Sequence, residues 1–242
     1  MGGRESSVER EGLEALFDGA VVVAGIVEHV RHGRVDLKGE GVSFTRPLNC
    51  GQCPAESALS PPERGMHSLC RRSNGVARPG GSATGDWEVE LTIVIGREAR
   101  HVSGAAAEEA IFGYTVMNDT SIRDWQFRTT QWMQGKAFES STPLGPVVVS
   151  RDEVDANNLR LWTELDGKVM QDSSTSDLIF KPVDIVAYCS QFITLEPGDV
   201  IATGTPSGVG NFRQPPVFIQ PGQTIRCGVD GIGELANRAV KE

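Results

Sequence analysis

The chain has 242 residues, enough for one large domain with or without a small appendage. Its 32 acidic and 23 basic side chains give a net charge of −9, which argues against nucleic acid and anionic membrane surfaces as partners. No stretch holds the roughly 18 apolar residues that a membrane-spanning helix needs. The five cysteines are odd in number and irregularly spaced, and the first 17 residues lack the apolar stretch of a secretory leader. We therefore expect a protein of the reducing cytoplasm, without a disulfide framework.

The first third of the chain shows few regular patterns. Residues 6–17 predict a short amphipathic helix behind a weak capping box, and residues 20–30 are apolar and β-branched enough for a strand. Residues 39–85 mix several prolines with Arg, Ser and Gly, which indicates loop with at most one short helix. We divide the chain into a small N-terminal lobe or extension, 1–45, and a main domain, 46–242.

From residue 86 onward the patterns become regular. Asp166-Gly167 lies between two strand-like runs and is a strong hairpin signal, because both central residues of a type I′ turn have positive φ. The 28 glycines and the few aromatic residues favour many short strands and tight turns. The predicted fold class is α+β, rich in strands, with a few short helices. The predicted strands are 87–96, 111–118, 146–150, 159–165, 168–171, 200–203, 224–229 and 234–240, and the predicted helices are 105–110, 121–130 and 182–193.

Three carboxylates stand out against this apolar background. Glu88 and Glu90 point to the same side of one predicted strand, since strand side chains alternate, and Asp119 directly follows the next strand. On spacing alone, an outer strand face that shows its Glu side chains to water is the commoner explanation. The other explanation is a site for a divalent cation, which would relieve the repulsion between neighbouring carboxylates. Oxygen ligands without nearby Cys or His favour Mg²⁺, Mn²⁺ or Ca²⁺ over Zn²⁺.

Several sequence blocks resemble the fumarylacetoacetate hydrolase family, in the family's order. The blocks are GDWEVELTIVIG (85–96), GYTVMNDTSIRDWQ (113–126), QGKAF (134–138), PLGP (143–146), QDSSTSDLIF (171–180) and LEPGDVIATGTPSGVG (195–210). The ending, residues 215–235, looks most like the branch that includes 2,4-diketo-3-deoxy-sugar-acid hydrolases and proteins named ureidoglycolate lyase. The resemblance implies a mixed β-roll or sandwich of the fumarylacetoacetase C-terminal type and a homodimer. It also implies a Mg²⁺ site, with Glu88, Glu90 and Asp119 as the ligands.

The same resemblance implies the rest of an active site. It assigns the catalytic lysine to Lys136 and substrate contacts to Gln126 and Thr205. Arg123 occupies the position of the family's arginine, whose role is either substrate binding or structural. The implied substrate is a small keto acid, and the implied reaction is hydrolysis of a C–C bond in an acylpyruvate or a 2,4-diketo sugar acid. Such a substrate can chelate the metal, while Lys136 stabilises the negative charge that develops on the leaving enolate.

One segment departs from the family pattern. The family activates a water molecule with a His and with a Glu three residues later, in a segment that aligns with residues 48–56. Here Glu56 is kept as a candidate base, but Cys53 replaces the His and Cys50 replaces a Tyr. The substitutions leave three hypotheses open. The protein is a C–C hydrolase, or it is a decarboxylase, tautomerase or isomerase of a β-keto acid, or it is a weakly active or inactive member.

The same segment has a second interpretation. Cys50, Cys53, His67 and Cys70 form a C-x₂-C…H-x₂-C pattern that is compatible with Zn²⁺. The family alignment already explains the first two cysteines as substituted positions, so it competes directly with the zinc hypothesis. Loss of bound zinc in a Cys53→Ser variant would support a zinc site.

Overall fold

The computed structural model describes residues 81–241 and, before them, five short strands at 22–23, 30–31, 34–36, 69–70 and 76–78. The predicted helix 6–17, the 48–56 segment with Glu56, and the zinc pattern's Cys50, Cys53 and His67 lie outside the described residues. The strand expected at 20–30 is described only at its two ends.

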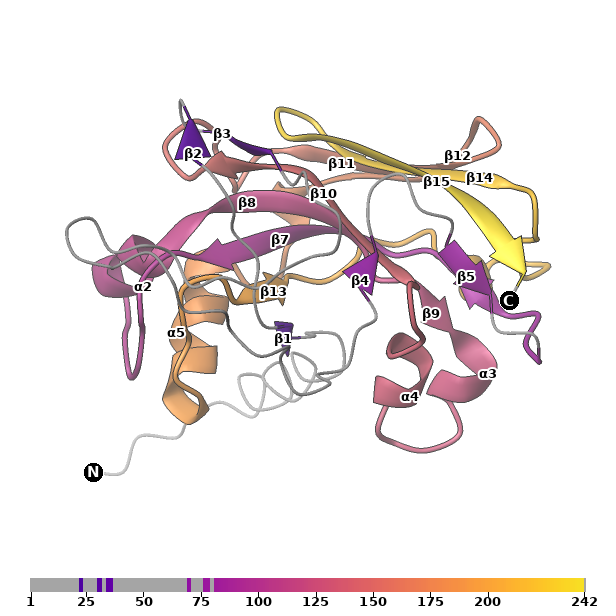
Figure 1. Ribbon diagram of the computed structural model, residues 1–242, viewed down its shortest axis with the longest axis horizontal. Helices are drawn as coiled ribbons and strands as arrows, with labels where there is room; N and C mark the ends of the chain where they lie inside the picture. The colour runs from indigo at the N-terminus through magenta and orange to yellow at the C-terminus, as the bar shows by residue number, and fades with distance from the viewer. Residues whose placement is uncertain are drawn as a thin grey trace, which may run out of the picture.

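The fold is built on two main sheets (Figure 1). The first has the order β1-β13-β7-β8-β10-β3-β2, with β4 beside β10, and the second has the order β12-β11-β14-β15-β5. The strands of the first sheet are β1 Val22–Val23, β13 Val200–Ala202, β7 Val89–Ile95, β8 Ile111–Asn118, β10 Thr142–Ser150, β3 Arg34–Asp36, β2 Val30–Arg31 and β4 Leu69–Cys70. Those of the second are β12 Lys168–Ser174, β11 Arg160–Leu165, β14 Thr224–Val229, β15 Gly233–Lys241 and β5 Val76–Arg78.

Short elements complete the described fold. A two-stranded ribbon pairs β6 (Gly85–Asp86) with β9 (Ser121–Ile122). The helices are α2 Ala105–Ala110, α3 Arg123–Gln126, α4 Met133–Lys136 and α5 Pro182–Phe192, with 3₁₀ turns η1 Thr175–Asp177 and η2 Gly210–Phe212. In Figure 1, α3 and α4 lie side by side next to β9, at the end of the molecule opposite α2. This strand-rich fold with few helices confirms the predicted class.

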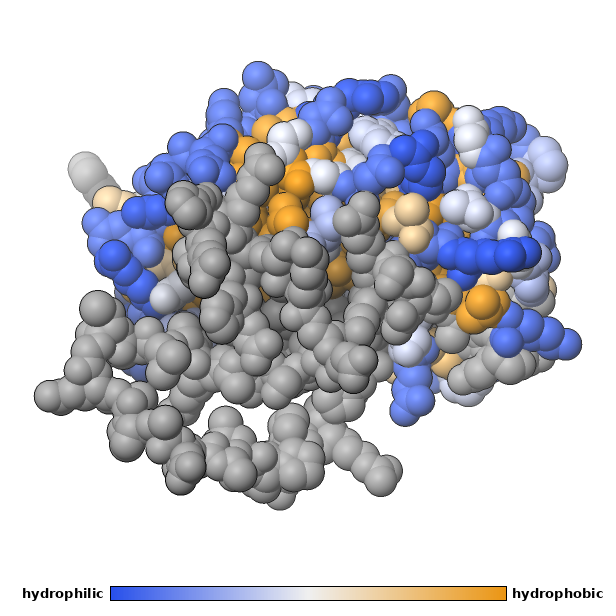
Figure 2. Space-filling view, turned by 45° about the horizontal axis from the view of Figure 1, so that its top comes forward, coloured by the Kyte–Doolittle hydropathy of each residue, from blue (hydrophilic) through white to orange (hydrophobic). Residues whose placement is uncertain are grey.

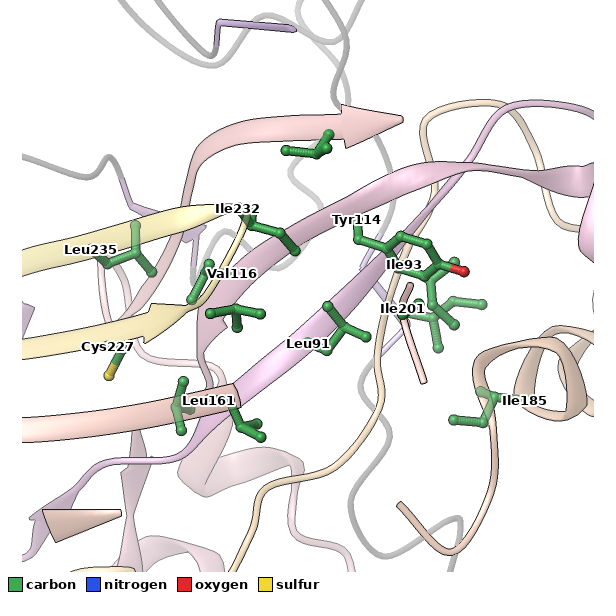
Figure 3. Close-up of a cluster of buried hydrophobic side chains, with 14 of the residues drawn as sticks. Leu91, Ile93, Tyr114, Val116, Leu161, Ile185, Ile201, Cys227, Ile232 and Leu235 are labelled. Carbon is green, nitrogen blue, oxygen red and sulfur yellow. The ribbon is translucent and has the colours of Figure 1, made fainter. Parts of the chain in front are cut away.

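The main core lies between the two sheets. All seven residues of β7 are buried, so neither face of this central strand meets water. Leu91 of β7 and Val116 of β8 contribute to the same apolar cluster as Leu161 of β11 and Leu235 of β15 (Figure 3). Full burial of side chains of this size stabilises a fold by about 1.5–3 kcal/mol each. The core therefore fixes β7, the strand that carries the candidate metal ligand Glu90 and directly follows Glu88.

Most of the predicted elements are present, one helix is wrong, and the segment predicted as loop, 39–85, contributes the short strands β4 and β5 and the start of β6. The Asp166-Gly167 hairpin is confirmed, with φ of 49° at Asp166 and 80° at Gly167. The helix predicted at 121–130 is instead split into β9 and the four-residue α3. Ser121 and Ile122 pair with Asp86 and Gly85 across more than 30 residues, and this tertiary pairing outweighs the local helical pattern.

The described part of the face seen in Figure 2 is largely polar. Hydrophilic residues dominate the coloured surface in Figure 2, with smaller hydrophobic areas between them. Among the described residues, no helix has the length and apolar character to cross a membrane, and the longest, α5, has 11 residues.

Candidate active site

The three predicted metal ligands converge at one edge of the β7–β8 pair. Val89 pairs with Asn118 in the antiparallel register, and the Asp119 amide donates a 2.9 Å hydrogen bond to the Glu88 carbonyl, so Asp119 lies directly beside Glu88. One carboxylate oxygen from each of Glu88, Glu90 and Asp119 lies within 4.8 Å of the other two. Their exposed fractions are 7%, 1% and 1%. The alternative of a solvated outer face is therefore wrong.

Lys136 joins two of these carboxylates. Its Nζ donates to Glu88 Oε2 at 2.9 Å and to Asp119 Oδ2 at 2.5 Å, and the side chain is only 7% exposed. Lys136 is the last residue of the short helix α4. A buried ammonium with two carboxylate partners has a fixed position, because leaving either charge unpaired would be costly. The predicted catalytic lysine thus lies inside the carboxylate cluster.

Helices α3 and α4 hold Lys136 in place through an unusually close contact. A Cβ atom on Gly135 would lie 2.6 Å from the Cβ of Gln126 and 2.8 Å from its Cα, so only glycine fits there. Gln126 is itself buried, and its Oε1 accepts a 2.7 Å hydrogen bond from Arg123. Gln126, predicted as a substrate contact, is therefore brought to the site beside Lys136.

Arg123 contacts two carboxylates and one amide oxygen. Its Nη2 lies 2.8 Å from Asp86 Oδ2 and 2.6 Å from Glu88 Oε1, and its Nε donates to Asp86 Oδ2 at 2.9 Å. Together with the Gln126 bond, these contacts engage every nitrogen of the guanidinium group. This geometry favours the structural role over substrate binding.

Asp86 is a site-supporting residue that sequence reasoning missed. Its side chain is fully buried, and its Oδ1 accepts hydrogen bonds from the Trp87 amide at 2.8 Å and the Gly210 amide at 2.6 Å. The Asn211 amide donates to Oδ2 at 2.9 Å. The only signal in the sequence was an acidic residue directly before a buried strand, which is common at ordinary strand ends.

The turn after β13 contacts the cluster at Glu90 and at the neighbouring Val89. The Gly204 amide donates a 2.6 Å hydrogen bond to Glu90 Oε2, and Gly204 has a φ of 101°, which suits glycine. The Thr205 hydroxyl lies 3.1 Å from the Val89 carbonyl, on the strand segment between the two glutamates. The predicted substrate contact Thr205 therefore lies next to the metal-ligand strand.

Burial and charge set the protonation of the cluster. Burial raises the pKa of Glu88, but the adjacent Lys136 and Arg123 outweigh it and hold that pKa below the usual range. Burial, followed by the charges of Asp119 and Glu88, holds the pKa of Glu90 well above its ordinary value. Burial is also the largest influence on Asp119 and raises its pKa. Burial opposes the charge on Lys136, but the carboxylates of Asp119 and Glu88 outweigh it and raise the pKa of the ammonium.

The donor set fits a hard divalent cation. Three carboxylates converge, all ligand atoms are oxygen, and burial together with the negative charges of Asp119 and Glu88 raises the pKa of Glu90, so the cluster lacks positive charge. Mg²⁺ and Mn²⁺ prefer carboxylate oxygens of this kind. A divalent metal would supply the missing charge.

The structure brings together all but one of the predicted site residues. Glu88, Glu90, Asp119, Lys136, Arg123, Gln126 and Thr205 surround one site, whereas Glu56 lies outside the described residues. Besides Asp86, two supporting residues went unpredicted. Asn118 accepts a 3.0 Å hydrogen bond from the Glu88 amide, and Gln171 contacts both Val89 and Thr205.

Known proteins resemble this chain over most of its length. A human protein named oxaloacetate tautomerase FAHD2A, mitochondrial, is 37% identical over 225 residues, which cover 91% of this chain and 66% of that protein. The chain thus spans just under two thirds of the length of this relative.

Solved structures share the fold at similar identity. A fumarylacetoacetate hydrolase from Exiguobacterium antarcticum is 36% identical, with a TM-score of 0.71, over 72% of this chain and 64% of that chain. A fumarylpyruvate hydrolase from Pseudomonas aeruginosa, solved in complex with Mn²⁺ and pyruvate, is 32% identical, with a TM-score of 0.65, over 72% of this chain and 76% of that chain. The pattern of the fumarylacetoacetate (FAA) hydrolase C-terminal family matches residues 51–240, which is most of the sequence. The chain therefore belongs to the fumarylacetoacetate hydrolase family.

Proposed function

We propose that this protein is a divalent-metal-dependent enzyme that interconverts the enol and keto forms of a small β-keto acid such as oxaloacetate. The observation that carries the proposal is the buried triad of Glu88, Glu90 and Asp119 with the ammonium of Lys136 inside it. Members of the family are enzymes, among them hydrolases, isomerases and tautomerases. An enolate is the species common to these reactions, and a divalent metal held by the triad would, together with the Lys136 ammonium, place positive charge beside an enolate oxygen.

Glu88, Glu90 and Asp119 would hold Mg²⁺ or Mn²⁺, and the bound ion would act as a Lewis acid on the substrate oxygens. Arg123 keeps Glu88 ionised and in place through its two short contacts with Glu88 and Asp86. The Gly204 amide donates a hydrogen bond to the Glu90 carboxylate and so orients this ligand. The chain thus presets the ligand geometry before a metal arrives.

Lys136 moves the proton in this scheme. In the enol-to-keto direction the enol hydroxyl gives its proton to solvent, the Lys136 ammonium gives a proton to the enolate carbon, and the resulting amine takes a proton back from solvent. The net change is a proton moved from oxygen to carbon, with Lys136 restored. The same Nζ donates hydrogen bonds to the developing oxyanion, a type of contact that typically accounts for a large part of a rate enhancement.

The Thr205 hydroxyl and the Gln126 amide are the proposed contacts for the substrate carboxylate. Thr205 is on the turn that also supplies the Gly204 amide to Glu90, and Gln126 is on the helix that packs against Gly135 next to Lys136. A carboxylate held between them lies beside the metal ligands and the proton donor.

Tautomerisation is favoured over hydrolysis by the residue at position 53. Hydrolysis of a C–C bond needs an activated water molecule, and Cys53 replaces the histidine that activates it in the family pattern. Moving a proton between oxygen and carbon needs no activated water molecule as a nucleophile. The name of the human relative, an oxaloacetate tautomerase, supports the same assignment.

Hydrolysis of an acylpyruvate is the second candidate. Glu56 is retained at the position of the family's base, and the structural neighbour that holds Mn²⁺ and pyruvate is a fumarylpyruvate hydrolase. Pyruvate release from acylpyruvates by the wild-type protein would favour this function. Pyruvate release only after a Cys53→His change would instead show that position 53 abolishes the hydrolytic step.

The homodimer and the cytoplasmic location stay predictions, to be checked by sedimentation and cell fractionation.

The test follows the disappearance of the oxaloacetate enol by its ultraviolet absorbance, with and without Mn²⁺. We expect an enzyme-dependent rate above the spontaneous one, lost after chelation of the metal and in a Glu90→Gln variant. Glu109→Gln is the matched control, because the Glu109 carboxylate is 62% exposed and, within the described residues, forms an ion pair only with the exposed Arg97. A wild-type rate equal to the spontaneous one in the presence of Mn²⁺, or full activity in Glu90→Gln, would reject the proposal.

A further inference from the structure

The Gln171 side chain is buried beside the site, and the proposed reaction assigns it no role. It belongs to β12 in the second sheet, yet its side chain is 1% exposed and reaches the strand of the metal ligands and the turn after β13. Its Oε1 accepts from the Val89 amide at 3.2 Å and from the Thr163 hydroxyl at 2.8 Å. Its Nε2 donates to the Thr205 hydroxyl oxygen and to the Pro206 carbonyl, both at 2.9 Å. All four hydrogen-bonding positions of the amide are therefore occupied.

The orientation of this amide is unambiguous. The Val89 amide can only donate and the Pro206 carbonyl can only accept, so a flipped Gln171 would place like groups against each other at both ends. Gln171 must therefore donate to Thr205 Oγ. The Thr205 hydroxyl in turn keeps its own proton for another acceptor, which in this structure is the Val89 carbonyl at 3.1 Å.

A β-bulge turns Gln171 inward. Thr163 pairs with Gln171 but Glu164 pairs with Val169, so Met170 is an extra residue in β12. The result is that Met170 and Gln171 are both buried, although neighbouring strand residues normally face opposite sides. Such bulges often redirect a side chain next to an active site.

The loop that follows the turn packs closely against this bulge. A Cβ atom on Gly208 would lie 2.4 Å from the Met170 carbonyl, and the Gly208 φ is 106°, so only glycine allows the loop to lie this close. The Arg213 guanidinium also donates to the Met170 carbonyl. The bulge and the turn are thus one rigid unit, with the Gln171 amide at its centre.

We propose that Gln171 is a positioning residue that orients the Thr205 hydroxyl as a hydrogen-bond donor toward the substrate carboxylate. The inference rests on the proposed function, because it needs Thr205 as the carboxylate contact. The Gln171 Nε2–H group donates to one side of Thr205 Oγ, so the Thr205 proton points away from Gln171 and is available to another acceptor. When an anionic substrate arrives, that proton turns from the Val89 carbonyl to a carboxylate oxygen, which is the stronger acceptor.

The experiment is a double-mutant cycle on substrate binding. Pyruvate is titrated calorimetrically into the Mn²⁺-loaded wild type, Gln171→Met, Thr205→Val and the double variant, after Mn²⁺ affinity has been measured for each. Both single variants should bind pyruvate about tenfold or more weakly, as expected for a lost hydrogen bond to a charged group. Because Gln171 acts through Thr205, the double variant should bind no more than about twofold more weakly than Thr205→Val alone. Mn²⁺ affinity should stay within about threefold of wild type in all four proteins.

Thr163→Val is the matched control. It removes a hydrogen bond from the opposite end of the same amide, at an equally buried position, and leaves both Nε2 contacts intact. We expect it to keep the pyruvate affinity of the wild type within about twofold. Multiplicative losses in the double variant, or an equal loss in Thr163→Val, would overturn the inference in favour of a general packing role.

Two further outcomes separate this inference from the proposed reaction. If Gln171→Met does not fold, Gln171→Glu replaces it in the cycle, since a carboxylate accepts the threonine proton and should weaken pyruvate binding at least as much. If the wild type binds pyruvate but tautomerises no β-keto acid, the proposed reaction fails and the cycle still decides the role of Gln171. If the wild type tautomerises oxaloacetate and all four proteins bind pyruvate equally, the role of Gln171 fails alone.

Discussion

At the scale of single residues, the site contains more buried carboxylates than cationic side chains, and the two cations hold the carboxylates in place. Asp86, Glu88, Glu90 and Asp119 face only Lys136 and Arg123 among their ion-pair partners in the described residues. Burying unpaired carboxylates is costly, and the raised pKa of Glu90 reflects that cost. A fold that served stability alone would gain from apolar residues at these positions, which supports a functional reason for the cluster.

Lys136→Met separates catalysis from metal binding. Without the ammonium, kcat for enol loss should fall by about 10²- to 10³-fold, the usual effect of removing one donor to a developing oxyanion. Metal affinity should be kept or should rise, because a positive charge next to Glu88 and Asp119 is removed. Steady-state kinetics and metal titration check the two halves of the prediction. An unchanged kcat would show that Lys136 only balances charge.

Asp86→Ala tests the support behind the metal ligands. The change leaves the Arg123 guanidinium without its main partner and frees the amides of Gly210 and Asn211, so the loss in unfolding free energy should be about 3–5 kcal/mol. Chemical denaturation measures it. Asp172→Ala, which removes an exposed ion pair with Arg160, should lose far less. Equal losses in the two variants would contradict the role assigned to Asp86.

At the scale of elements, two short helices position the catalytic lysine. Helices α3 and α4 have four residues each, too short to be stable by themselves, and their contact depends on the missing side chain of Gly135. The lysine position is thus set by the packing of one helix against the other and not by helix propensity.

Gly135→Ala should displace Lys136 although the added methyl group meets Gln126 and not the lysine. The new methyl group would clash with Gln126, push α4 away from α3, and destabilise the fold by about 1–3 kcal/mol. Displacement of the lysine by about 1 Å should lower kcat by about a hundredfold. Thermal unfolding and kinetics measure the two effects. Gly81→Ala is the control, because no atom of the described residues lies within 4 Å of its Cβ position. Full activity in Gly135→Ala would show that the helix contact is adaptable.

At the scale of the whole molecule, protons and metal compete for one buried site. The folded, metal-free protein holds a proton on Glu90 more tightly than the unfolded chain does, and the same holds for Asp119. Its unfolding free energy therefore falls as pH rises from the ordinary carboxyl range up to the raised pKa of Glu90. Glu88 acts in the opposite direction, but its lowered pKa confines that effect to more acidic solution.

Metal should reverse this pH dependence. Mn²⁺ takes the place of the protons, so the increase in melting temperature on adding Mn²⁺ should be larger at pH 8 than at pH 5. Thermal scans with chelator and with excess Mn²⁺ at both pH values measure the difference. In Glu90→Gln the increase should shrink at both values. An increase that is independent of pH in the wild type would contradict a proton-linked site formed by these carboxylates.

Local sequence by itself determined the elements whose signals span a few residues. The Asp166-Gly167 turn, the short helix α2 and the strand β8 follow from turn chemistry and apolar periodicity, and the spacing of Glu88 and Glu90 placed them on one side of a strand. Asp119 followed from its place directly after the next strand, and the resemblance of several blocks to one family supplied Lys136 and the substrate contacts.

Only the tertiary structure decided what lies next to what. The burial of Glu88 and Glu90, the split of the predicted helix at Ser121, and the reach of Gln171 from the second sheet to Val89 all depend on contacts between residues at least 30 positions apart. Such contacts are set by strand register and by the packing of two sheets, which no short window of sequence contains. The sequence therefore identified most of the chemical groups of this site, and the fold determined how they are held.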